Sequence, residues 1–85
     1  MTFEGAVIKE QGITFGVMVV KAHVLGDTSQ RDTIIRQASR AFGGIPTVLM
    51  GQGGGGPKYY GRKDIVQFMS KVPIHAVPWK KYTLN

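Results

Sequence analysis

The stretch Ile13–Leu25 reads ITFGVMVVKAHVL, an apolar run rich in β-branched residues. In an extended chain Phe15 and Val17 point to one side, and Met18 and Val20 point to the other. A strand that is apolar on both faces belongs in the middle of a sheet covered on both sides. Because the chain is short of helices, we expect part of that cover to come from a second copy or from the C-terminal tail.

The residues before this stretch predict a β-hairpin. Thr2–Glu10 alternates loosely, with Ala6 and Ile8 on one face and Phe3, Val7 and Lys9 on the other. Gln11-Gly12 then supplies a short turn, in which glycine can adopt a positive φ.

The residues after it predict an α-helix. Gly26-Asp27-Thr28-Ser29 offers several N-cap candidates, and Gly43-Gly44 ends the helix as an αL cap requires. Arg36 and Arg40 share a polar face, where Asp32 is expected to pair with Arg36. One continuous apolar face is formed by Ile34, Ile35, Ala38, Ala41 and Phe42.

The second half predicts three further elements. Ile45–Met50 reads as a short strand parallel to its neighbour, reached by a right-handed crossover, and Pro57–Tyr60 reads as a short returning strand. Arg62–Val72 has the apolar spacing of a second helix. The tail, Ile74–Asn85, contains Pro78 and is expected to be an edge strand or an extended arm.

These elements predict a single α/β domain spanning residues 1–85. We expect a two-layer sandwich in which a mixed sheet of four or five strands packs against two helices, in the order β-β-α-β-(β)-α-β. The length, 85 residues, leaves no room for a second domain. No apolar run approaches the ~20 residues that span a bilayer, so no membrane partner is expected. The chain has no Cys and no visible signal peptide, which fits a cytoplasmic location.

Charge is distributed unevenly along the chain. Eleven Lys and Arg face five Asp and Glu, giving a net charge of +6. Residues 1–32 hold three basic and four acidic residues, a net of −1, whereas residues 33–85 hold eight basic residues and one acidic residue, a net of +7. Such a field attracts polyanions over roughly a Debye length.

The sequence does not predict catalysis. Gly51–Gly56 contains a GxGxxG spacing, but Pro57 follows in place of a helix, and it also separates the glycines from Lys58. His23, expected on the strand, and His75, expected in a loop, stand 52 positions apart, without cysteines to complete a metal site. We therefore expect no catalytic residue, no metal and no cofactor.

One segment resembles part of a known family. Gly44-Ile45-Pro46-Thr47-Val48-Leu49-Met50, the glycine-rich hairpin, Gly61 and the helix Arg62–Val72 resemble the C-terminal β-β-α half of thioredoxin-like domains. The resemblance covers about a third of the chain and implies a cis Ile45–Pro46 bond. The paired cysteines of that family are absent, so the resemblance implies a redox-inactive relative.

The leading functional hypothesis is a non-catalytic binding module whose basic second half contacts an anionic partner, nucleic acid first. In this half aromatic residues alternate with cations, which suits bases that stack and phosphates that attract charge. The alternatives are a homo-oligomeric protein-interaction domain and the redox-inactive thioredoxin-like module. Tyr59 and Trp79 are alternatively read as core residues. The candidate contact residues are Arg36, Arg40, Lys58, Tyr60, Arg62, Lys63, Lys80, Lys81 and Tyr82.

Overall fold

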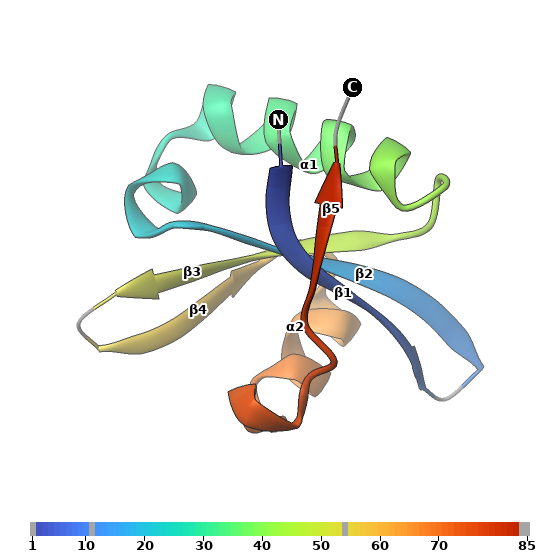
Figure 1. The fold of residues 1–85 in the computed structure, drawn as a ribbon. Coiled ribbons are helices and arrows are strands. Elements are labelled where there is room, and N and C mark those ends of the chain that lie inside the picture. The colour runs from blue at the N-terminus through green and yellow to red at the C-terminus, as the bar shows by residue number, and fades with distance from the viewer. Residues whose placement is uncertain (1, 11, 54, 84–85) are drawn as a thin grey trace.

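The computed structural model describes residues 2–10, 12–53 and 55–83. Over these ranges the chain forms five strands, two α-helices and two short 3-10 helices (Figure 1). In chain order these are β1 (Thr2–Glu10), β2 (Ile13–Lys21), η1 (Ala22–Gly26), α1 (Thr28–Ala41), β3 (Thr47–Gly53), β4 (Gly56–Tyr60), α2 (Lys63–Met69), η2 (Ile74–Ala76) and β5 (Lys80–Thr83).

The strands form one mixed sheet in the order β4-β3-β2-β1-β5. The β2 and β3 strands are parallel and are joined through η1 and α1, whereas the other neighbours are antiparallel. The predicted α/β class, with its mixed sheet and two helices, is confirmed. The tail supplies an edge strand, as expected.

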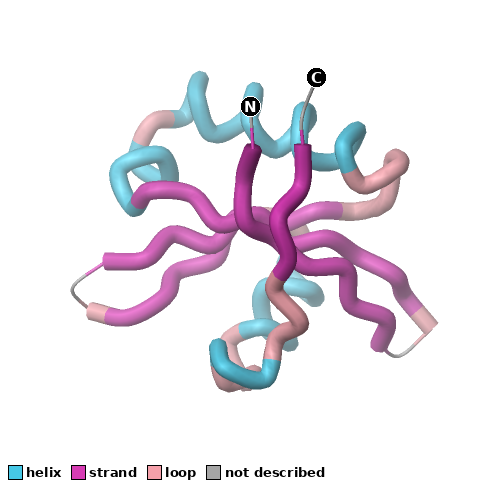
Figure 2. The backbone as a smooth tube through the Cα atoms, in the orientation of Figure 1, coloured by secondary structure: helices cyan, strands magenta, loops and turns pink. Residues whose placement is uncertain are grey.

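The two helices lie on opposite faces of the sheet, α1 above and α2 below it in Figures 1 and 2. We call these the α1 side and the α2 side. Each has its own core cluster. The buried residues of the α1 side are Phe3, Met18, Ala38 and Leu49. Those of the α2 side are Ala6, Phe15, Val17, Val48, Met50, Ile65, Met69 and Val77.

The two-sided cover explains the sequence of β2. Its predicted faces are confirmed, because Phe15 and Val17 are buried against α2 and Met18 is buried against α1. The second cover comes from α2 and the tail, where Val77 is buried and Trp79 packs against the same cluster. We predicted self-association partly because one face of this strand was expected to lack cover within the chain. Since α2 and the tail cover that face, self-association stays a prediction that this argument no longer supports.

The α1 helix has the caps that its sequence predicts. The carboxylate of Asp27 accepts a hydrogen bond from the Gln30 N–H at 3.0 Å. At the other end, the Gly44 N–H donates to the Ser39 carbonyl and the Gly43 N–H donates to the Arg40 carbonyl. Both glycines have positive φ, so the end is a Schellman motif.

Several local predictions were wrong, among them the bounds of the strand predicted for Ile45–Met50, which the structure places at Thr47–Gly53. The strand predicted for Ile13–Leu25 ends at Lys21, and His23 therefore lies in η1. The turn of η1 brings Leu25 over Gly51, where an added Cβ would lie 2.8 Å from a Leu25 methyl carbon. The α2 helix is also shorter than predicted and ends at Met69. Asp32 does not pair with Arg36, because its carboxylate contacts Arg31 and Tyr60 instead.

The Ile45–Pro46 peptide bond is trans, like every peptide bond in the described ranges. The cis bond that the thioredoxin-like resemblance implies is therefore not found. The Pro46 carbonyl accepts a hydrogen bond from the Gly16 N–H at 2.8 Å, so this segment already leads into the β2–β3 pairing. The resemblance is reduced to the order of the elements.

Candidate anion-binding surface

The sheet order separates the predicted contact residues. Lys58 and Tyr60 lie on β4, at one edge of the sheet, whereas Lys80, Lys81 and Tyr82 lie on β5, at the opposite edge. The remaining four stand on helices or at a helix start: Arg36 and Arg40 on α1, and Arg62 and Lys63 at the beginning of α2. The nine residues are therefore spread over both sides and both edges.

Strand register assigns the lysines to sides, because residues opposite each other on neighbouring strands point to the same face. Lys58 stands opposite Gly51, which Leu25 covers from the α1 side. Lys80 stands opposite Gly5, which Phe42 covers from the same side. Lys81 stands opposite Glu4 and points to the α2 side.

The structure places four of the predicted cations on the α1 side and adds a fifth. Arg36 and Arg40 are exposed one turn apart on α1. Lys9 lies an even number of residues after Phe3 along β1, so both side chains point to the α1 side. Charge counted along the chain missed Lys9 because it lies in the acidic first third. The exposed α1-side cations are Lys9, Arg36, Arg40, Lys58 and Lys80.

The two carboxylates on the α1 side are engaged within the fold. Asp27 caps α1. Asp32 accepts a hydrogen bond from the Tyr60 hydroxyl at 3.2 Å and lies 3.8 Å from the Arg31 Nε. Within the described ranges, the α1 side thus carries six basic residues, Arg31 and the five exposed cations, and two acidic ones, a net charge of +4. Among the described residues, none of its five exposed cations forms an ion pair.

Arg62 is held by a neighbouring carboxylate on the α2 side. Its Nε and one terminal nitrogen each donate to Asp64 at 2.8 Å. This hydrogen-bonded pair raises the pKa of Arg62 and lowers the pKa of Asp64. Because a bidentate pair occupies the donors that would meet a phosphate, Arg62 is less available to an anion than Arg36 or Arg40.

The two predicted tyrosines already have partners. The Tyr60 ring lies beneath the guanidinium of Arg31, 3.9 Å from its central carbon. The Tyr82 ring stacks on Phe3 with a centroid separation of 5.6 Å and meets Phe42 edge-on at 4.9 Å. Both side chains are half-buried, so each ring has a structural role.

The chain matches no protein-family model, no curated protein and no solved structure. Its charge, burial and geometry therefore carry the functional inference.

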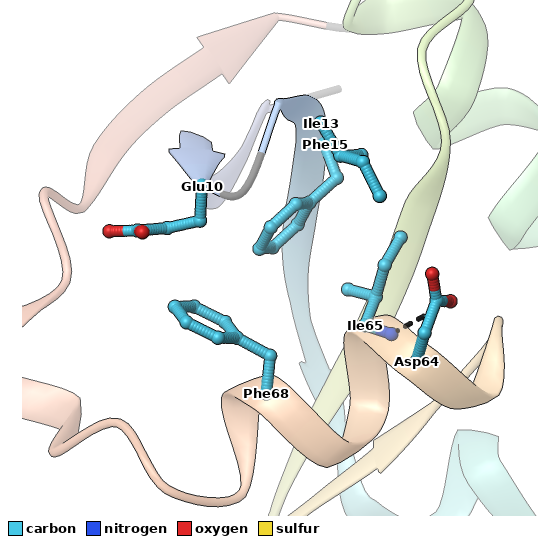
Figure 3. A pocket seen from close by; sticks show the side chains of 6 residues that line it. All are labelled: Glu10, Ile13, Phe15, Asp64, Ile65 and Phe68. Atoms are coloured by element: carbon cyan, nitrogen blue, oxygen red, sulfur yellow. Dashed lines mark hydrogen bonds between the residues drawn. The ribbon is translucent and has the colours of Figure 1, made fainter.

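The pocket in Figure 3 is too small for a metabolite. It has a volume of about 40 Å³, enough for a few waters, whereas ligand sites typically occupy ~300–1,000 Å³. Its two carboxylates, Glu10 and Asp64, lie at opposite ends (Figure 3). Asp64 is turned toward the Ile65 N–H, from which it accepts a hydrogen bond at 3.0 Å. The pair is not arranged for acid–base chemistry.

The described residues contain no cluster of three or more His, Cys, Asp or Glu placed to hold a metal ion. His23 and His75 lie exposed in η1 and η2. In the same ranges, no helix has the length and apolar composition needed to cross a bilayer.

Proposed function

We propose that the protein is a non-catalytic binding module whose α1 side contacts the phosphate backbone of a nucleic acid. The main support for this proposal is which charged residues of the α1 side already have partners in the fold and which do not. Five exposed cations stand on that side without ion-pair partners among the described residues, while Asp27 and Asp32 are engaged in the fold. Neutralising phosphates with such residues releases counterions and favours binding.

The chemistry of the surface favours recognition that tolerates many sequences. Lys and Arg on an exposed helix and at sheet edges meet phosphates well, but phosphate contacts carry no base information. Tyr60 and Tyr82, which would stack on bases, have rings that already contact Arg31 and Phe3. The affinity is therefore expected to depend strongly on salt and weakly on sequence.

The test compares two charge-reversal variants with equal net charge. Fluorescent single- and double-stranded DNA and RNA are titrated with wild type, with Arg36→Glu/Arg40→Glu, and with Arg62→Glu/Lys63→Glu as the matched control. The α1 variant should lose at least tenfold more affinity than the control at low salt. Its plot of log K against log salt should also be shallower, by ~0.7–0.9 for each phosphate that the variant no longer neutralises.

Two results would contradict the proposal. Wild type that fails to bind at low salt, where attraction to polyanions is strongest, removes the function. Equal losses in the two variants would mean that net charge, and not the α1 side, determines the affinity.

A further inference from the structure

The outer edge of β1 is only half occupied. The strand pairs with β2 over Gly5–Glu10, but on its other edge it pairs with β5 only over Thr2–Gly5. Beyond Gly5 the outer edge has no strand partner in the described parts of the chain (Figure 1). The unpaired N–H and C=O groups of such an edge are a template for another strand.

A largely apolar groove runs along this open edge, between β1 and the elements of the α2 side. Its volume is about 360 Å³. It also continues toward the pocket of Figure 3, because Glu10 and Phe68 line both. On the sheet side it is lined by Val7, Ile8, Lys9 and Glu10, and on the other by Phe68, Val72, Ala76 and Pro78.

The two sides of the open edge differ in chemistry. On the α2 side Ile8 faces the apolar wall formed by α2 and η2, with Glu10 at the far end. On the α1 side the neighbours are Val7, which is 40% exposed, and the cations Lys9 and Lys80. A strand added here would therefore place apolar side chains toward α2 and acidic side chains toward α1.

We propose that the open edge of β1 binds an extended segment of another protein as an additional antiparallel strand, in which apolar residues alternate with Asp or Glu. The proposed direction is that of β5, which pairs antiparallel with β1 on the same edge. Backbone hydrogen bonds would supply affinity, and the apolar groove with its flanking lysines would supply specificity.

A second copy of this chain fits the edge less well. Both carboxylates of β1, Glu4 and Glu10, point to the α2 side, so a second β1 offers no acid to Lys9 or Lys80. Two chains of net charge +6 also repel each other. Charge complementarity thus selects an acidic partner.

The probe is a fluorescein-labelled peptide with the sequence Thr-Glu-Ile-Glu-Val, measured by fluorescence anisotropy. A scrambled isomer, Glu-Glu-Thr-Ile-Val, has the same charge and composition without the alternation. Two further versions carry N-methyl groups, one on the odd and one on the even amides. Because alternate N–H groups of a strand point to opposite edges, only one methylated version should lose binding.

The protein variants test the groove with matched substitutions. Ala76→Glu places a carboxylate on the exposed groove wall, and Ala22→Glu makes the same change on an exposed alanine of η1. We expect a loss of at least tenfold in peptide affinity for Ala76→Glu and little change for Ala22→Glu. Circular dichroism checks that both remain folded. Arg36→Glu/Arg40→Glu should keep peptide binding, so this inference can fail or succeed independently of the proposed nucleic-acid function.

Three outcomes would overturn it. Equal binding of the peptide and its scrambled isomer would indicate unspecific attraction to a basic protein. Equal behaviour of the two methylated peptides would exclude strand addition. A dimer in sedimentation equilibrium that is abolished by Ala76→Glu, with no binding of the peptide, would mean that a second copy occupies the edge.

Discussion

The guanidinium carbon of Arg31 lies 3.9 Å from the centre of the Tyr60 ring, which joins α1 to the edge strand β4. The same guanidinium donates to the Leu25 carbonyl at 3.2 Å, so it also contacts η1. Tyr60 in turn donates its hydroxyl to Asp32. One half-buried arginine therefore connects three elements, unlike the exposed arginines of the same helix.

Replacing Arg31 by Met should lower the free energy of unfolding by about 1–2 kcal/mol, because the variant has neither the cation–π interaction nor the hydrogen bond to Leu25. The control Arg36→Met, at an exposed position of α1, should change it by less than about 0.5 kcal/mol. Urea unfolding gives both values. Equal effects would assign no special role to Arg31.

Loss of the hydroxyl should lower the free energy of unfolding at Tyr60 but not at Tyr59. Tyr60→Phe removes the bond to Asp32 and should cost about 0.5–1.5 kcal/mol. The Tyr59 hydroxyl is buried without a hydrogen-bond partner, and burial raises the pKa of this phenol. Tyr59→Phe should therefore be neutral or stabilising in the same urea measurement, and a loss above about 1 kcal/mol would contradict this.

Gly16→Ala should destabilise the protein by about 1–3 kcal/mol through overpacking. A Cβ at this position would lie 2.8 Å from Cε2 of Phe42, and closer to another carbon of that ring. Gly26→Ala is the control, since a Cβ there meets no atom within 4 Å. In a Phe42→Ala background the cost at Gly16 should largely disappear, and thermal unfolding of wild type, the two single variants and the double variant measures this coupling.

The exposed Arg62–Asp64 pair should give a small acid dependence of stability. The hydrogen bond from Arg62 lowers the pKa of Asp64 below its ordinary value of 3.8. A lowered folded-state pKa contributes stability above that ordinary value, and the contribution is lost as pH falls through the folded pKa. Carbon NMR titration should show Asp64 returning toward 3.8 in Arg62→Gln, and an unchanged titration would contradict the pairing.

The sequence predicted those parts of the fold that local periodicity determines. The two faces of β2 and the caps of α1 depend on residues that are close in sequence, and both were found. Beyond the end of β2, Leu25 packs over Gly51, a contact between residues 26 positions apart. No local pattern marks such a contact.

The candidate site was predicted less well, because charge along a chain differs from charge in space. The sheet order places Lys58 and Lys80 at opposite edges while keeping both on the α1 side. Lys9 joins them from the acidic first third, and the only sequence signal for it was that Lys9 and Phe3 fall on the same face of the predicted strand. The hydrogen-bonded pair of Arg62 and Asp64 forms at the turn before α2. The spacing of the two residues in the sequence does not indicate this pair.

Thr2 and Thr83 are register partners at the same end of β1 and β5, so the two ends of the described chain lie side by side (Figures 1 and 2). A short Gly/Ser linker could therefore close the polypeptide into a ring without altering any strand pairing. New ends opened between β3 and β4 would give a circular permutant with the same sheet but a different order of synthesis. In that permutant β5 and β1 would follow each other directly in the chain. The longest-range strand pairing of the fold would thus become a local hairpin.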